Sequence, residues 1–235
     1  AVTGMNRTDA RTSEEQLSMN FRKPMAAAFA AIIASAYAGA GDIQLMEPMM
    51  ENPGTLMEAL QGRSSCRSFL PDTLSTREMS DLLWAAFGIN RPETGGRTAP
   101  SALNHQEMDI YVATAEGTYL YDPAANTLRM TGSTDIRALT GMQPFVAEAP
   151  VNLVLVADFS RMGFRGREVG DDEKLFFAAC DAGFICQNVY LYCAVNGLAA
   201  VVRAGMDKAA LREALGLRPE QHLILAQTIG RPAPL

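Results

Sequence analysis

The sequence predicts an α+β domain, and three observations indicate this class. Short runs of alternating or β-branched residues follow one another between 108 and 130, with turn residues between them. A mostly apolar run spans 151–157, and a long apolar pattern with helical character spans 172–195. The runs at 108–130 are typical of an antiparallel meander, and the run at 151–157 is typical of a strand covered on both faces. The pattern at 172–195 is typical of a buried helix.

The first half of the domain begins with a connector at 42–53 that has little periodicity. Apolar residues at helical spacing then predict a short helix over 56–61. Ser75 and Glu78 form a capping box, which predicts the start of an amphipathic helix extending over 79–89. A glycine-rich, charged loop follows at 90–97.

The second half of the domain holds the strands. We expect strands at 108–113, 117–122, 127–130, 151–157, 198–202 and 222–229. We expect helices at 134–139, after the turn 141–145, at 172–195 and at 208–215. Asn196 and Gly197 end the long helix, which should be buried, with contact between subunits as one way to bury it.

Composition and charge limit the kind of protein. Of the 235 residues, 48% are hydrophobic and 20% charged, which is typical of a globular chain. The 20 basic and 26 acidic residues give a net charge of −6, so we expect no general attraction to nucleic acid and any anion site must be local. Four cysteines without a CxxC pair, together with two histidines, argue against a zinc site and a structural disulfide. Cys186 and Cys193 are interpreted as core residues.

The N-terminal residues 1–41 form a tail before a single domain at 42–235. Within it, 19–40 combines basic residues, an uncharged run and small residues at Ala36, Ala38 and Ala40. This pattern predicts an export signal, and the run is too short for a membrane span. A cleaved signal would make the mature protein periplasmic or otherwise exported. The alternative is an alanine-rich helix that lies on the domain or a partner, in a cytoplasmic protein.

The segment 62–69 is the most distinctive short motif. It places Arg63 and Arg67 four residues apart, with Ser64 and Ser65 between them. Guanidinium groups grip anionic oxygens and serine hydroxyls add adjustable donors, so the cluster suits a phosphate. Taken alone, however, such a short basic cluster is more typical of a solvated turn.

No arrangement of a nucleophile and a base stands out elsewhere. GxSxG, GxGxxG and Walker motifs are absent from the sequence, which argues against hydrolase and nucleotide-triphosphate functions. His105 could act as a base, but a histidine beside a turn is more often a surface or hydrogen-bonding residue. Asp171 and Asp172 are expected to begin the long helix, where they favour its dipole.

Four segments in this order resemble the FMN-dependent nitroreductase superfamily. They are the cluster 63–69, the loop 100–106, the long helix ending at 197–198, and the closing segment 228–232. The resemblance covers about 56–234. The segment 82–91, Leu-Leu-Trp-Ala-Ala-Phe-Gly-Ile-Asn-Arg, is most similar to the branch that includes peptide thiazoline and oxazoline dehydrogenases. The resemblance implies a central, mainly antiparallel sheet flanked by helices, in an intertwined homodimer with FMN at the subunit interface.

The resemblance also implies which residues bind FMN. Arg63, Ser65 and Arg67 would hold its phosphate and ribityl chain and reach the pyrimidine edge, and Ser64 lies in the same element. Further contacts would come from Pro100, Ser101, Ala102 and Asn104 of the other subunit, from Arg231 to the phosphate, and from Gln143, Ala199 and Ala200. Ala102 replaces a serine that is usual in the family, and the chain ends at Leu235 without a longer basic tail.

The activity implied is hydride transfer through flavin N5. The resemblance favours reduction of nitroaromatic, quinone-like or other conjugated acceptors by NADPH or NADH in ping-pong order. Arg67 is the candidate for stabilising reduced flavin, because a cation near the flavin carbonyl edge favours the anion. One alternative is a flavin dehydrogenase that oxidises a peptide-derived or small heterocycle, which export would favour because NAD(P)H is not expected outside the cytoplasm. Another is a flavin carrier or sensor without turnover.

Overall fold

The computed structural model describes residue 1 and residues 41–51 and 54–234. The predicted export signal at 19–40 lies outside these residues. The division into a tail at 1–41 and a single domain at 42–235 therefore stays a prediction.

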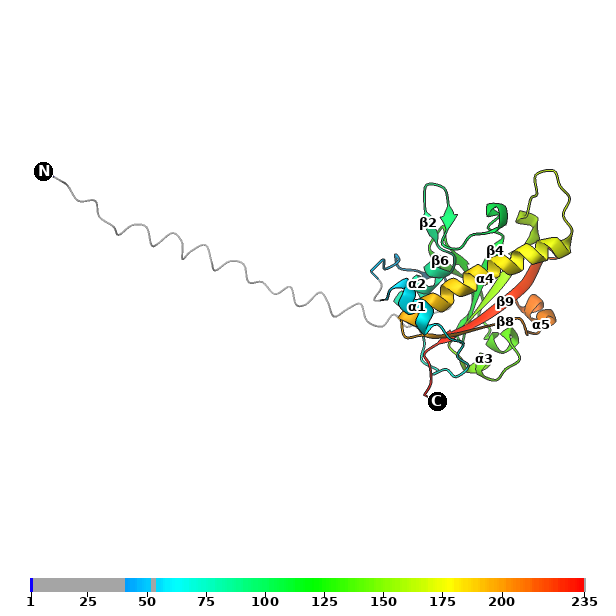
Figure 1. Ribbon diagram of the computed structural model, residues 1–235. Helices are drawn as coiled ribbons and strands as arrows, with labels where there is room; N and C mark the ends of the chain where they lie inside the picture. The colour runs from blue at the N-terminus through cyan, green and yellow to red at the C-terminus, as the bar shows by residue number, and fades with distance from the viewer. Residues whose placement is uncertain (2–40, 52–53, 235) are drawn as a thin grey trace. The chain divides into compact units, whose positions relative to one another are not determined.

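A seven-stranded antiparallel sheet forms the centre of the domain (Figure 1). Its order is β1-β6-β5-β4-β7-β9-β8. The strands are β1 (Ile43–Gln44), β4 (Met108–Thr114), β5 (Gly117–Asp122), β6 (Thr127–Gly132), β7 (Val151–Asp158), β8 (Ala199–Arg203) and β9 (Gln221–Gly230). The α+β class and the meander of β4, β5 and β6 are confirmed.

Helices cover both faces of this sheet. They are α1 (Leu56–Gly62), α2 (Thr76–Phe87), α3 (Phe145–Glu148), α4 (Asp171–Val195) and α5 (Lys208–Ala214), with 3₁₀ turns η1 (Ala102–Asn104), η2 (Arg137–Thr140) and η3 (Phe159–Arg161). On β7, Leu153 and Leu155 join the larger core with α2 and α4, while Val154 and Val156 join a second core with Leu211 of α5. The central strand is therefore buried on both faces, as its unbroken apolar run predicts.

Capping boxes begin the two helices that flank the Arg63 cluster. Thr55 and Glu58 cap α1, and Ser75 and Glu78 cap α2. In each box a side chain satisfies a free backbone N–H at the start of the helix, which fixes where the helix begins. The cluster at 62–69 therefore starts where α1 ends, as expected.

Three short strands were missed by the sequence prediction. β1 lies in the expected connector, and β2 (Ile89–Arg91) and β3 (Gly96–Arg97) form a hairpin where we expected the end of a helix and a loop. The expected helix at 134–139 is wrong in type and position, because η2 is a 3₁₀ turn at Arg137–Thr140. Elements of two to four residues carry no periodicity of their own, and β1 depends on a remote partner, with Ile43 paired to Leu128.

The long helix α4 matches its predicted extent, but it is not buried all round within one chain. Ala178 and Ile185 are fully buried, whereas Phe176 and Phe184 are 65% and 48% exposed. By length and composition α4 could cross a membrane. Its inner face, however, is part of the core of the domain, so we interpret it as a core helix with one apolar stripe exposed.

The four cysteines are free thiols. Cys186 and Cys193 are buried in the larger core, which confirms their interpretation as small apolar residues. Burial raises the pKa of the Cys186 thiol to about 12, so this thiol stays protonated at neutral pH.

Candidate functional site

The segment that follows α1 lies against β8 and the C-terminal residues. Ser65 pairs with Ala200 in parallel, and the Cys66 N–H donates to the Ala200 carbonyl at 3.0 Å. Phe69 then pairs antiparallel with Pro232. These backbone contacts hold the segment 65–69 against two parts of the chain that lie more than a hundred residues further along the sequence.

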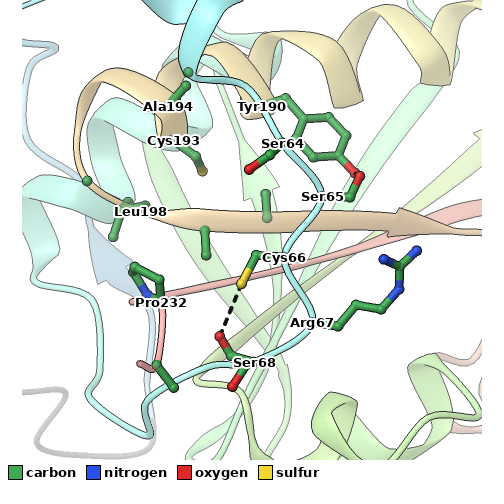
Figure 2. A pocket seen from close by; sticks show the side chains of 15 residues that line it. Ser64, Ser65, Cys66, Arg67, Ser68, Tyr190, Cys193, Ala194, Leu198 and Pro232 are labelled. Carbon is green, nitrogen blue, oxygen red and sulfur yellow. Dashed lines mark hydrogen bonds between the residues drawn. The ribbon is translucent and has the colours of Figure 1, made fainter. Parts of the chain in front are cut away.

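A pocket of about 590 Å³ opens between this segment and the end of α4 (Figure 2). Polar groups come mainly from the extended segment, while α4, β8 and the turn between them supply an apolar wall that includes Cys193, Leu198 and Ala199. The lining residues are Gly62, Ser64, Ser65, Cys66, Arg67, Ser68, Tyr190, Cys193, Ala194, Gly197, Leu198, Ala199, Ala200, Pro232 and Ala233. Five residues proposed from the sequence, Ser64, Ser65, Arg67, Ala199 and Ala200, therefore share one pocket.

Tyr190 of α4 organises the polar end of this pocket. Its hydroxyl lies 2.9 Å from the Ser65 hydroxyl and accepts the Val202 N–H at 2.9 Å. The guanidinium carbon of Arg63 sits 5.4 Å from the centre of the Tyr190 ring, within cation–π distance. Sequence reasoning missed Tyr190, because one tyrosine in a largely apolar helix resembles a core residue.

The two arginines of the segment are not neutralised within the chain. In the described part of the chain, neither Arg63 nor Arg67 forms an ion pair with a carboxylate. Arg67 in the pocket lining and Arg63 beside Tyr190 are thus two uncompensated cations in a protein of net charge −6, which favours anion binding here.

Arg63, Arg231 and Gln143 were expected near FMN but do not line the pocket, and Arg63 lies against the Tyr190 ring instead. The Arg231 guanidinium pairs with Glu78 at 2.7 Å. Burial acts to raise the pKa of Glu78, but hydrogen bonds from Ser75 and the Arg231 pairing outweigh it and lower that pKa. Gln143 is exposed in the turn before α3. The contacts of Arg231 and Gln143 with FMN stay predictions.

The loop 100–106 forms a separate, tightly held structure. The Ser101 hydroxyl accepts the Gln106 N–H at 2.9 Å, and the Asn104 side-chain oxygen accepts from the Gln106 amide at 3.1 Å. Leu103, Asn104 and Gln106 all have positive φ angles, of 50°, 57° and 50°. Such angles are costly for residues other than glycine, and they concentrate at functional sites.

This loop does not line the pocket of its own chain. The Ala102 N–H donates to Asp181 of α4 at 2.8 Å, whereas the pocket is built around Tyr190. Nine residues of helix separate these positions, or about 14 Å along the axis. Pro100, Ser101, Ala102 and Asn104 are thus placed apart from Ser64, Ser65 and Arg67 within one chain.

His105 and the acidic start of α4 have local roles. A ring nitrogen of His105 lies 2.8 Å from the Gly163 carbonyl, and the ring packs edge-on against Phe164. This placement fits the hydrogen-bonding role that we favoured for His105. Asp171 and Asp172 occupy the first turn of α4, as expected.

A buried acidic pair next to the loop was also missed by the sequence analysis. Glu107 is fully buried and Asp181 is 3% exposed. Burial raises the pKa of Glu107 to about 7, and the neighbouring Asp181 adds to the effect. Asp181 is a single acid in an apolar stretch and Glu107 lies in a polar segment 74 residues earlier, so nothing in the sequence shows that they meet.

Comparison with known proteins identifies the family. Residues 60–231 match the nitroreductase family. A protein of Methanocaldococcus jannaschii that is provisionally named a nitroreductase is 29% identical over 186 residues, which is 75% of this chain and 90% of that protein.

Solved structures agree with this match. A provisionally named nitroreductase from Ralstonia eutropha JMP134 is 42% identical, with a TM-score of 0.76, over 83% of this chain and 90% of its own. Another, from Desulfovibrio desulfuricans, was solved in complex with FMN; it is 25% identical, with a TM-score of 0.55, over 78% of this chain and 88% of its own. The chain described here belongs to the nitroreductase family.

Proposed function

We propose that this protein is an FMN-dependent oxidoreductase that works as a homodimer. The observation that carries the proposal is the pocket beside Tyr190, where Arg67 and serine hydroxyls meet an apolar wall and Arg63 lies against the Tyr190 ring. Membership of the nitroreductase family supports an oxidoreductase, and the FMN complex of the Desulfovibrio protein supports this cofactor.

The residues present fit FMN. Arg63, Arg67 and Ser65 offer charged and neutral donors for a phosphate, while Ala199 and Leu198 offer an apolar wall for a ring system. The extended backbone between 64 and 68 lies along the pocket, so further polar atoms face a bound ligand. This division into a polar end and an apolar end matches the two ends of a flavin mononucleotide.

The dimer follows from the incompleteness of this site within one chain. The loop with Ser101 and Asn104 lies about 14 Å along α4 from the Tyr190 end of the pocket. A two-fold partner packed along the exposed stripe of α4, which includes Phe176 and Phe184, would bring its loop to this chain's pocket. Each flavin would then lie between two chains.

When bound, FMN supplies reversible hydride transfer at N5. Arg67, which lines the pocket, would favour the negative charge of the reduced state. We propose NADH or NADPH as the donor and a nitroaromatic, quinone-like or other conjugated compound as the acceptor, in ping-pong order.

Anaerobic mixing of the FMN-loaded protein with NADH and with NADPH tests this direction of reaction. We expect rapid loss of the oxidised flavin absorbance with at least one of them, and its return when a quinone is added. Flavin that stays oxidised with both nucleotides would contradict the proposal. Reduction by a thiazoline or oxazoline peptide would then point to a dehydrogenase, and inertness toward every donor to a carrier or sensor.

A further inference from the structure

The carboxyl group of Glu107 lacks an ordinary partner. It is fully buried just before β4, and in the described part of the chain no donor reaches either of its carboxyl oxygens. The polar group that it faces is the carboxyl of Asp181, on α4. Two carboxylates offer acceptors only, so their contact is favourable only when one of them carries a proton.

Among the residues that the structure describes, no cation nearby neutralises both acids. Besides Asp181, the charged side chain that acts on Glu107 is Arg161 of η3, and its effect is the smaller one. Arg161 pairs with Asp109 at 2.8 Å, lies 3.9 Å from Asp158, and donates to the backbone carbonyl of Glu107. The guanidinium is therefore committed elsewhere, and two negative charges at the Glu107–Asp181 contact would be costly.

Asp181 connects this contact to the loop. It accepts the Ala102 N–H at 2.8 Å, directly before Leu103 and Asn104 with their positive φ angles. Glu107 lies directly after Gln106, at the other end of the same loop. The acidic contact thus ties together the two ends of a strained segment that needs outside support to keep its conformation.

We propose that Glu107 and Asp181 share one proton, as a carboxylic acid hydrogen-bonded to a carboxylate, and that this pair positions the loop 101–106. Both are positioning residues, because they act through the loop. The loop's contact with the partner's flavin rests on the proposed function, whereas the shared proton does not depend on it.

Loss of the proton from Glu107 should weaken the contact with Asp181 that holds the loop 101–106. While Glu107 is protonated, it donates to Asp181, whose other oxygen can accept the Ala102 N–H. The pKa of Glu107 is raised to about 7, so the proton is lost as the pH rises through the neutral range. The two carboxylates then repel each other, and the loop loses its fixed conformation.

Infrared spectroscopy of the purified protein, without added flavin, tests the shared proton directly. We expect a protonated-carboxyl band that persists to about pH 7 and then disappears. Glu107→Gln should lack the band, while Asp181→Asn should move its loss to lower pH because the like charge is gone. Glu116→Gln, at an exposed turn, is the matched control and should behave like the unmodified protein.

Flavin titrations of the same proteins test the positioning role. The unmodified protein and Glu116→Gln should bind FMN on the order of tenfold more weakly at about pH 9 than at about pH 6. Glu107→Gln should bind equally at both values, because its amide donates to Asp181 at any pH.

Each negative result has a separate meaning. A protonated-carboxyl band that remains in Glu107→Gln, or one whose pH dependence is unchanged in Asp181→Asn, would overturn the shared proton. Retention of the pH-dependent FMN affinity in Glu107→Gln would overturn the positioning role. Failure of every variant and of the unmodified protein to bind FMN would instead contradict the proposed function.

Discussion

Tyr190 is the residue that supports the end of the pocket proposed to bind phosphate. Its hydroxyl meets Ser65 and its ring lies against Arg63, so one side chain of α4 holds two of the proposed FMN ligands. A preorganised site loses less conformational freedom when a ligand binds. We therefore expect replacement of Arg63, a proposed FMN-binding residue, and replacement of Tyr190, which holds it in place, to weaken FMN binding to different extents.

Replacing Arg63 tests a ligand directly. We expect Arg63→Ala to weaken FMN binding by roughly 1.5–3 kcal/mol, which is the usual value of a hydrogen bond to a charged group. The measurement is a fluorescence titration of the apoprotein with FMN. Lys208→Ala removes the same charge from an exposed position on α5 and should leave the affinity unchanged. Equal affinities for the two variants would refute the role of Arg63.

Replacing Tyr190 tests the support in two steps. Tyr190→Phe keeps the ring beside Arg63 but removes the partner of Ser65 and of the Val202 N–H, so we expect about tenfold weaker FMN binding. Tyr190→Leu also removes the ring and should weaken binding further. Titration with FMN, with circular dichroism as a check on folding, would show whether the two effects occur in this order. Wild-type affinity in Tyr190→Leu would contradict it.

Replacing Asn104 tests the other half of the site. We expect Asn104→Ala to change the rate of flavin reduction while the fold is kept, because its side chain contacts Gln106 within the exposed loop and no core residue. Stopped-flow reduction by NAD(P)H gives the rate, and the melting temperature reports the fold. An unchanged rate would place the loop away from the flavin.

The sequence reveals residues of this site only where they occur together. Arg63, Ser65 and Arg67 are close in the chain and form a visible motif, so they could be proposed before the structure was known. Tyr190 and Asp181 stand alone in an apolar helix, and their roles arise from remote contacts with Ser65 and Ala102. Such partners depend on tertiary packing, which local periodicity does not encode.

At the level of elements, α4 carries the clearest difference between expectation and structure. A helix that is apolar all round predicts burial, but one chain buries only the side with Ala178 and Ile185. Phe176 and Phe184 on the other side require a partner surface to leave water. Elements with a strong pattern of their own were predictable, such as the unbroken apolar run of β7 and the amphipathic pattern of α2, whereas the short strands β1, β2 and β3 were not.

A charge on this exposed stripe tests the dimer. We expect Phe184→Glu to shift the protein to monomers and to weaken FMN binding at least about tenfold, because a charge in an apolar interface costs several kcal/mol. Size-exclusion chromatography with light scattering measures the mass. Met142→Glu, at a side chain that is 81% exposed in another turn, is the control and should stay dimeric. A dimeric Phe184→Glu protein would place the interface elsewhere.

For the whole molecule, the buried Glu107 links stability to pH. Its pKa in the folded state, about 7, is above the value of 4.5 expected for an exposed glutamate, so ionisation is harder in the folded protein. The stability contributed by the protonated group is therefore complete below about pH 4.5 and declines as the pH rises toward 7.

Glu107→Gln should remove this decline. We expect the variant to exceed the unmodified protein in free energy of unfolding by roughly 3 kcal/mol above about pH 7, with little difference near pH 4.5. Urea unfolding across this range measures the difference. A constant difference at every pH would show that Glu107 does not titrate in this way.

The fold as a whole explains why one chain holds separated parts of a site. The seven-stranded sheet lies alongside α4 (Figure 1). The pocket lies near the C-terminal end of this helix, and the loop is anchored nearer its middle, at Asp181. Family resemblance allowed the fold and the expected cofactor to be stated from the sequence. The proposed joining of two chains would depend on a partner surface that no single sequence pattern specifies.

Native mass spectrometry of the protein reconstituted with FMN tests the central claim most directly, since it reports the number of chains and flavins in one particle. The account predicts two chains with two FMN molecules, and loss of FMN whenever the chains separate. Monomers that retain FMN, or dimers that take up none, would contradict a flavin site shared between two chains.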